Sequence, residues 1–185
     1  MLGLKIVTLV LGSAVLVFIS RASLLKPGTH GFYRYFAWET ILLLFLHYVS
    51  FWYTNPFAWY QCISWFILSI SFVPLLWGIF LLRKQGKPVE VRESESNLLA
   101  FEKTTRLVST GIYRYIRHPL YSSLLLLAWG IFFKLPSWIG GSLVMVATGF
   151  LFLTALTDEQ ECLRFFGDVY QEYMKKTRRF IPFLF

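Results

Sequence analysis

Charged residues are scarce in this sequence. They make up 15% of the 185 residues, whereas 56% are hydrophobic and 19% are aromatic. A soluble domain of this length carries roughly 25% charged residues. The composition therefore argues against an ordinary cytosolic globular domain and favours a protein embedded in a lipid bilayer.

Cysteine is also rare, and Cys62 and Cys162 are the two in the chain. The apolar runs described below place them near opposite faces of a bilayer, about 30 Å apart. A disulfide needs Cα atoms within about 7 Å, so these two cysteines are not expected to form one. Two isolated cysteines also lack the spacing of metal ligands, and we predict no metal site.

Long apolar runs occupy most of the chain. A helix that crosses a bilayer needs about 20 mostly apolar residues, because its backbone groups must be satisfied within the segment. Five runs approach this description, the fourth when Tyr115 and Ile116 extend it. They are Leu2–Ser20, Ala37–Trp52, Trp59–Leu82, Pro119–Phe133 and Ile139–Leu156. The sequence thus predicts an all-α integral membrane protein with about five transmembrane helices.

The first run has a second interpretation, as a signal peptide. Arg21 and Lys26 follow it, and no small-residue cleavage site is evident, so we favour a retained helix. We divide the single membrane domain into a three-helix region, residues 1–82, and a second region, residues 83–185.

Acidic residues number 10 against 18 lysines and arginines, which gives a formal net charge of +8. Three, eight and five of the basic residues fall in segments 21–35, 83–117 and 164–179, which five spans place on one side of the membrane. Cytosolic loops are enriched in Lys and Arg. We therefore expect an outside N-terminus, with the long loop and the C-terminus in the cytosol. The charge indicates topology and attraction to anionic lipid rather than nucleic-acid binding.

Three polar features lie beside these runs. Glu39 is expected near the cytosolic end of the second run, and Asn97 is expected to cap a short helix from Leu98 to about Thr105. After the fifth run, apolar residues at helical spacing predict an amphipathic C-terminal helix, with Gly167 as a possible interruption. The apolar residues that follow it, 180–185, are expected to pack back on the bundle.

Three polar clusters are expected to meet at the cytosolic edge of the membrane: Tyr113–Tyr121, Asp158–Glu161 and Arg178–Arg179. The tight connection between the fourth and fifth runs makes the first two neighbours. Carboxylates, arginines, a histidine and aromatic rings together suit a zwitterionic, partly cationic ligand. The alternative is an interfacial network of ion pairs that fixes the tail.

Two blocks of sequence resemble a known signature. The first block is Leu107–Tyr121, and the second is Asp158-Glu159, Phe166-Gly167, Tyr170, Tyr173 and Arg179–Pro182. Together they resemble the signature of the superfamily of isoprenylcysteine carboxyl methyltransferases and phospholipid methyltransferases. The resemblance covers about residues 98–185. It implies S-adenosyl-L-methionine as cofactor, bound at the cytosolic edge, and a lipophilic or lipidated acceptor, with neither metal nor nucleic acid.

The resemblance also implies roles for individual residues. Arg179 and Glu159 are expected to act on the acceptor, Arg179 by orienting an anionic nucleophile. If the nucleophile is an amine, Glu159 or Glu161 is the candidate base. The expected cofactor-binding residues are Arg106, Leu107, Val108, Tyr113, His118, Leu120, Tyr121, Asp158 and Glu159. Which acid of the pair Asp158 and Glu159 holds the cofactor stays open.

The acceptor is less defined than the cofactor. Isoprenylcysteine enzymes tend to carry an arginine one helical turn before the acidic pair, and Thr154 stands there in this chain. Carboxyl O-methylation of an isoprenylated cysteine is the first expectation, with a phospholipid amine or a small thiol as alternatives. A nicotinamide-dependent membrane reductase and a non-catalytic membrane scaffold are the other classes.

Overall fold

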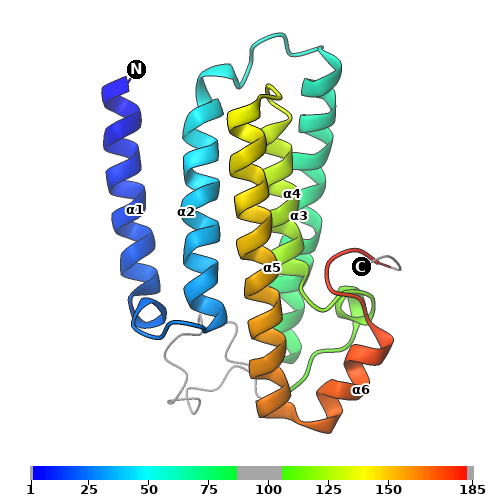
Figure 1. Cartoon of the computed structure of the whole chain (residues 1–185). Coiled ribbons are helices and arrows are strands. Elements are labelled where there is room, and N and C mark those ends of the chain that lie inside the picture. Colours follow the sequence, from blue (N-terminus) through cyan, green and yellow to red (C-terminus); the bar gives the residue numbers. More distant parts are fainter. Residues whose placement is uncertain (1, 87–105, 183–185) are drawn as a thin grey trace.

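The computed structural model describes residues 2–86 and 106–182, which form a bundle of helices (Figure 1). Within those residues the regular elements are helices, and the all-α prediction is confirmed. The α-helices are α1 (Leu2–Leu24), α2 (His30–Tyr48), α3 (Trp59–Gln85), α4 (Pro119–Phe132), α5 (Trp138–Phe166) and α6 (Asp168–Lys176). Two short 3-10 helices, η1 (Val49–Phe51) and η2 (Gly111–Arg114), lie between them.

Length and composition suit three of these helices to crossing a membrane. They are α1, α3 and α5, with mean hydropathies of 2.4, 2.2 and 2.0 over their most apolar stretches. Helix α4 is apolar but has only 14 residues, which at 1.5 Å per residue is shorter than a bilayer core. The predicted membrane character is therefore confirmed, while the predicted number of five spans is not established.

Local sequence signals fix the ends of the helices. The Thr29 side chain accepts a hydrogen bond from the Phe32 amide at the start of α2, and Ser137 accepts one from the Gly140 amide at the start of α5. Pro119 occupies the first turn of α4, where its missing N–H costs nothing. Gly167 has φ of +60° and separates α5 from α6, as the sequence indicated.

Helix α2 packs along α5, and α3 packs along α4, with α1 at the edge of the bundle against α2 (Figure 1). The core between the four inner helices is formed by a cluster of buried residues: Ile41, Leu44, Tyr48, Leu68, Ala128, Ile131, Val144 and Ala147. By contrast, none of the apolar stretch of α1 is buried inside the protein. Its exposed apolar side chains suit lipid contact, since a helix that is apolar all round belongs in a membrane.

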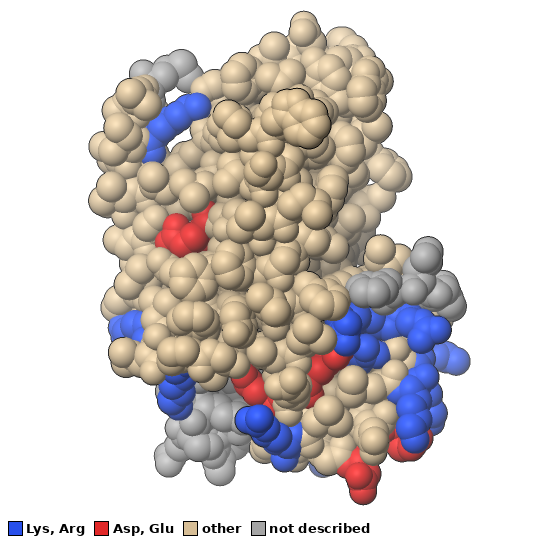
Figure 2. Space-filling model, in the orientation of Figure 1, with Lys and Arg blue, Asp and Glu red and all other residues tan. Residues whose placement is uncertain are grey.

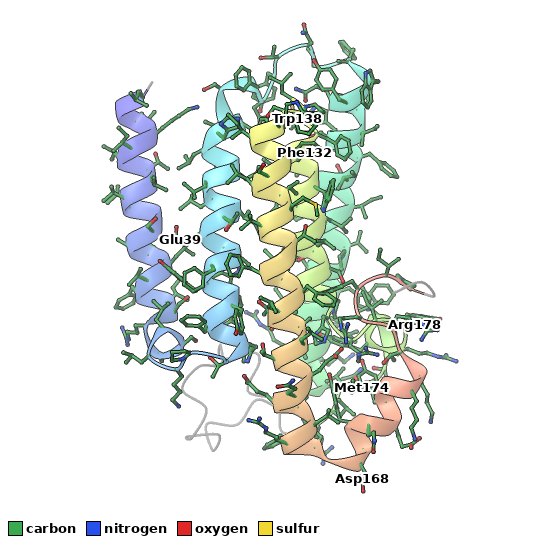
Figure 3. The ribbon with its side chains drawn as sticks, viewed as in Figure 1. Glu39, Phe132, Trp138, Asp168, Met174 and Arg178 are labelled. Atoms are coloured by element: carbon green, nitrogen blue, oxygen red, sulfur yellow. The ribbon has the colours of Figure 1, made fainter. Side chains whose placement is uncertain are left out.

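The expected place of Glu39 was wrong. Helix α2 begins at His30 rather than Ala37, so Glu39 lies in the middle of the helix and not near its end (Figure 3). Its carboxylate oxygen Oε2 accepts a hydrogen bond from the Ser13 hydroxyl of α1 at 2.9 Å. Figure 2 shows an acidic patch midway along the bundle, apart from the charged side chains that gather at one end. Helix α2 starts early because Thr29 caps it there.

The end of the bundle that holds the α2–α3 and α4–α5 connections is closed by polar contacts. Gln61 donates from Nε2 to the carbonyls of Phe51, Thr54 and Lys134 at 3.0–3.2 Å. The Lys134 ammonium donates back to Gln61 Oε1 at 3.1 Å and lies 3.2 Å from the centre of a Trp65 ring. The buried ammonium is thus paired with an amide oxygen and with aromatic rings.

At the opposite end, α6 folds back beneath the bundle, and the tail after it returns toward α4 (Figure 1). Tyr170 and Tyr173 are the buried residues of α6, and Phe180 in the tail is also buried. The amphipathic helix is thus confirmed, and the return of the tail is confirmed at Phe180, whereas Ile181 and Pro182 are exposed. The helix expected at Leu98–Thr105 lies outside the described residues.

Candidate functional site

A pocket opens where α2, α3, α5, α6 and the segment leading into α4 meet. Its empty space, including the open mouth, is about 850 Å³. The pocket is lined by apolar, aromatic and ionisable side chains together. These are His30, Leu82, Leu107, Val108, Tyr113, Arg117, His118, Pro119, Leu120, Tyr121, Asp158, Glu161, Cys162, Phe166, Tyr170 and Tyr173.

Two glycines let the segment before α4 approach α3 closely. Gly111 has φ of +58°, and a Cβ there would lie 2.6 Å from Leu81 Cδ1. A Cβ on Gly78 of α3 would lie 3.2 Å from Pro119 Cγ and 3.6 Å from the Tyr113 hydroxyl. The positive φ of Gly111 would strain any larger residue there, and a side chain at Gly78 would require Pro119 to shift.

His118 is buried between the two acids of α5. Its Nδ1 lies 3.4 Å from Asp158 Oδ2, and its Nε2 lies 3.3 Å from Glu159 Oε1. Its ring stacks on Tyr121, with centroids 5.3 Å apart and 20° between the planes. Burial alone would lower the pKa of His118, but the hydrogen bonds to Asp158 and Glu159 raise this pKa above its ordinary value.

Glu159 belongs to an ion-pair cluster behind the pocket wall, which we call the Glu159 clasp: Glu159, Arg117 and Arg179. Arg117 Nε donates to Glu159 Oε1 at 2.8 Å. Arg179 donates from Nε to Oε1 at 3.0 Å and from Nη2 to Oε2 at 2.7 Å. The Glu159 side chain is 5% exposed, so this carboxylate is committed to the two arginines and His118.

The tail is joined to the segment before α4 by backbone hydrogen bonds. The Arg117 and His118 amides donate to the carbonyls of Arg178 and Arg179 at 2.7 and 3.2 Å, and the Arg178 amide donates to the Tyr115 carbonyl at 2.9 Å. This forms a parallel bridge between Ile116 and Arg178. Figure 3 shows Arg178 in the tail, beyond the α6 residue Met174. The tail therefore holds His118 by main-chain contacts as well as through the Glu159 clasp.

One face of α5 supplies the polar wall of the pocket. Asp158, Glu161, Cys162 and Phe166 follow one another at helical spacing and line it. Glu161 Oε2 lies 2.7 Å from His30 Nδ1, and Glu161 Oε1 accepts from the His30 amide at 2.9 Å. The first residue of α2 is in this way fixed to the pocket wall.

Helix α6 closes the pocket with two tyrosines. The Tyr173 hydroxyl donates to the Tyr113 carbonyl at 2.6 Å, which ties α6 to the segment before α4. Burial raises the pKa of both Tyr170 and Tyr173 well above the ordinary value. Both phenols therefore stay neutral, and they present uncharged aromatic surface to the pocket.

The structure brings most of the expected cofactor-binding residues to this pocket. Seven of the nine line it: Leu107, Val108, Tyr113, His118, Leu120, Tyr121 and Asp158. Arg106 is exposed and is not among the lining residues. Glu159 and Arg179 lie in the Glu159 clasp, next to the pocket rather than on its surface.

Sequence reasoning assigned no binding role to several lining residues, although it included Phe166, Tyr170 and Tyr173 in the signature. Cys162 and Phe166 had a usable signal, since they follow Asp158 at intervals of four on one helix. Tyr170 and Tyr173 lie on the apolar face that was expected to contact the membrane surface. His30 had no local signal, because it lies 131 residues before its partner Glu161.

Thr154 does not present a polar group to the site. It is fully buried, and its hydroxyl donates to the Phe150 carbonyl at 2.7 Å. The position that carries an arginine in the isoprenylcysteine enzymes therefore supplies no positive charge here. Among the described residues, no group of three or more His, Cys, Asp or Glu side chains is arranged to hold a metal ion.

Comparisons with known proteins agree with the sequence signature. Residues 92–176 match the model of the phospholipid methyltransferase family. A segment of 99 residues is 33% identical to the protein-S-isoprenylcysteine O-methyltransferase of Schizosaccharomyces pombe. The aligned segment makes up 52% of this chain and 42% of the relative. No solved structure matches the chain. These matches support the assignment of residues 92–176 to the superfamily of isoprenylcysteine carboxyl methyltransferase and phospholipid methyltransferase-like membrane proteins, and the chain spans less than half the length of the curated relative.

Proposed function

We propose that this protein transfers the methyl group of S-adenosyl-L-methionine to a lipophilic acceptor at the membrane edge. The observation that carries the proposal is the pocket itself. The segment that matches the methyltransferase family supplies fourteen of its lining residues, all except His30 and Leu82. The pocket therefore lies where this superfamily's sequence signature lies.

The side chains that are present fit this cofactor. S-adenosyl-L-methionine carries an ammonium, a carboxylate, a sulfonium, ribose hydroxyls and an adenine ring. Asp158 and Glu161 offer carboxylates to hydroxyls or an ammonium, and Arg117 offers a guanidinium to a carboxylate. Aromatic faces such as that of Tyr121 favour a cation.

When bound, the cofactor supplies an electrophilic methyl group for an in-line displacement. The residues of this chain align the reactants and exclude water. His118 holds Asp158 at the pocket wall, and the Glu159 clasp holds His118 in turn. A carboxylate or thiolate acceptor needs no base, so the chain's contribution is position rather than proton transfer.

The acceptor end is proposed to involve Arg179. Its guanidinium packs over the Phe152 ring at 5.2 Å, and its side chain is 20% exposed. An anionic acceptor would share this guanidinium with Glu159. The first candidate is the carboxyl group of an isoprenylated cysteine, since the curated relative carries that activity in its name.

A second candidate acceptor is a phospholipid amine, favoured by the family model that matches the chain. An amine nucleophile must lose a proton to a base. Glu159 is committed to two arginines, whereas Glu161 lines the pocket. In that case Glu161 is the better placed base.

Binding and turnover experiments separate these possibilities. Calorimetry of the detergent-purified protein is expected to show binding of S-adenosylhomocysteine and none of a nicotinamide dinucleotide. The reverse result would favour a reductase. Incubation with isotopically labelled S-adenosyl-L-methionine, followed by mass spectrometry, is expected to label an isoprenylcysteine analogue. Label in phosphatidylethanolamine or a small thiol instead would assign the acceptor to that class.

We further propose that the pocket faces the cytosol. Basic residues gather at the pocket end of the face shown in Figure 2, whereas Lys5 lies near the start of α1, at the other end of the bundle (Figure 1). Cytosolic surfaces of membrane proteins are enriched in such residues. A membrane-impermeant maleimide applied to intact cells is expected to label Cys62, which is exposed. If a cysteine introduced at Arg178 were labelled instead, the protein would have the opposite orientation in the membrane.

A further inference from the structure

His30 belongs to a part of the chain that the family match does not cover. The match begins at residue 92, whereas His30 is the first residue of α2. It is nevertheless 1% exposed and lines the pocket. The pocket is therefore built partly from outside the segment that identifies the superfamily.

His30 holds Glu161 through two separate groups. The backbone amide donates to Glu161 Oε1 at 2.9 Å, and ring Nδ1 lies 2.7 Å from Glu161 Oε2. Because a carboxylate can only accept, Nδ1 carries the proton in this contact. The positive end of the α2 dipole adds to the attraction. Two contacts to two oxygens fix both the position and the rotation of this carboxylate.

Glu161 and Asp158 lie three residues apart on α5, and both line the pocket. Each is anchored by a histidine from a different element, Glu161 by His30 of α2 and Asp158 by His118 before α4. The Glu161 side chain is 28% exposed, so it is held and still open to a ligand. A side chain with this exposure would otherwise sample several rotamers.

We propose that His30 is a positioning residue that holds Glu161 as a second cofactor-binding carboxylate beside Asp158. The proposal rests on the proposed function, in which the pocket binds S-adenosyl-L-methionine. It makes the start of α2 part of the cofactor site. The ligand groups that suit Glu161 are hydrogen-bond donors, either a hydroxyl or an ammonium.

The test is a double-mutant cycle with S-adenosylhomocysteine as the probe, measured by calorimetry on the full chain in detergent. Glu161→Ala and His30→Ala are each expected to weaken binding about tenfold, the loss expected for a hydrogen bond to a charged group. If His30 acts through Glu161, the double variant loses about tenfold and not about a hundredfold. His30→Asn keeps a side-chain N–H near the place of Nδ1 and is expected to restore most of the affinity.

Thr29→Ala is the matched control. It removes the cap of α2 one residue earlier, where the Thr29 hydroxyl accepts from the Phe32 amide at 3.4 Å, and leaves both contacts to Glu161 in place. It is expected to lower the thermal midpoint and leave the affinity unchanged. A His30→Ala variant whose lower midpoint comes with unchanged affinity would show that His30 only joins α2 to α5.

The two proposals fail in different ways. A folded wild-type protein that does not bind S-adenosylhomocysteine would overturn the proposed function and this inference with it. Wild-type binding that survives both Glu161→Ala and His30→Ala would overturn this inference alone. Additive losses in the double variant would show that His30 contacts the ligand independently of Glu161, which also contradicts the positioning role.

Discussion

Glu159 binds Arg179 through both of its carboxylate oxygens, at 3.0 and 2.7 Å, while one of those oxygens also accepts from Arg117 at 2.8 Å. One nearly buried negative charge thus joins the tail, the segment before α4 and helix α5. Its neighbour Asp158 faces the pocket instead. Two adjacent acids of one motif therefore have different surroundings, one in an ion-pair cluster and one at the pocket.

Removal of the Glu159 carboxylate is expected to destabilise the fold. Glu159→Ala leaves Arg117, whose side chain is 8% exposed, without its charged partner, which costs about 3–5 kcal/mol of unfolding free energy for a buried pair. Thermal unfolding in detergent measures the loss. Glu172→Ala is the control, because it breaks an exposed pair with Lys175 on α6 and is expected to change little. Equal midpoints for both variants would show that the clasp contributes no stability.

Asp158 is expected to contribute more to cofactor affinity than its neighbour Glu159. Asp158→Asn should weaken S-adenosylhomocysteine binding about tenfold, because a pocket carboxylate that bonds to the ligand becomes neutral. Glu159→Gln should lower the thermal midpoint more and the affinity less. Calorimetry under matched detergent conditions compares the two. Stronger loss of affinity in Glu159→Gln would assign the cofactor to the other acid of the pair.

His118 is expected to make stability depend on pH. Its pKa is raised in the folded protein, so protonation is favoured by folding. This stabilisation is complete below the unfolded value of about 6.5 and is lost as pH rises through the raised folded value. The difference in thermal midpoint between wild type and His118→Asn should therefore be largest below about pH 6.5 and shrink at higher pH. A difference that grows with pH would show that the neutral ring is the favoured form.

Labelling of Cys162 is expected to report ligand binding in the pocket without a measurement of catalytic turnover. It lines the pocket, whereas Cys62 is an exposed cysteine of α3. S-adenosylhomocysteine is expected to slow maleimide labelling of Cys162 severalfold in detergent and to leave Cys62 unaffected. Peptide mass spectrometry separates the two sites. Equal labelling of Cys162 with and without the ligand would place the ligand elsewhere.

Features that a local sequence pattern encodes could be predicted from the sequence. Apolar runs predicted the positions of α1 and α3. The signature around His118 predicted cofactor-binding residues, and most of them line one pocket. The start of α2 was mistaken because Thr29 and His30 precede the apolar run. Helix caps carry short polar signals that an apolar window does not register.

The features that the sequence did not predict depend on contacts between residues far apart in the chain. Asp158 and Glu159 are adjacent, so on a helix they point about 100° apart, and only the packing of α5 decides which one meets the pocket. The contact between His30 and Glu161 has the same origin, since it depends on how α2 lies along α5. It also means that the pocket crosses the proposed division between residues 1–82 and 83–185.

The bridge between Ile116 and Arg178 sets the order in which the site is assembled during synthesis. Residues 177–180 are made after all the helices that the structure describes, yet their carbonyls hold the amides of Arg117 and His118. A nascent chain that ends before residue 178 lacks this support, so the wall of the pocket around Arg117 and His118 is completed only when the tail has been made.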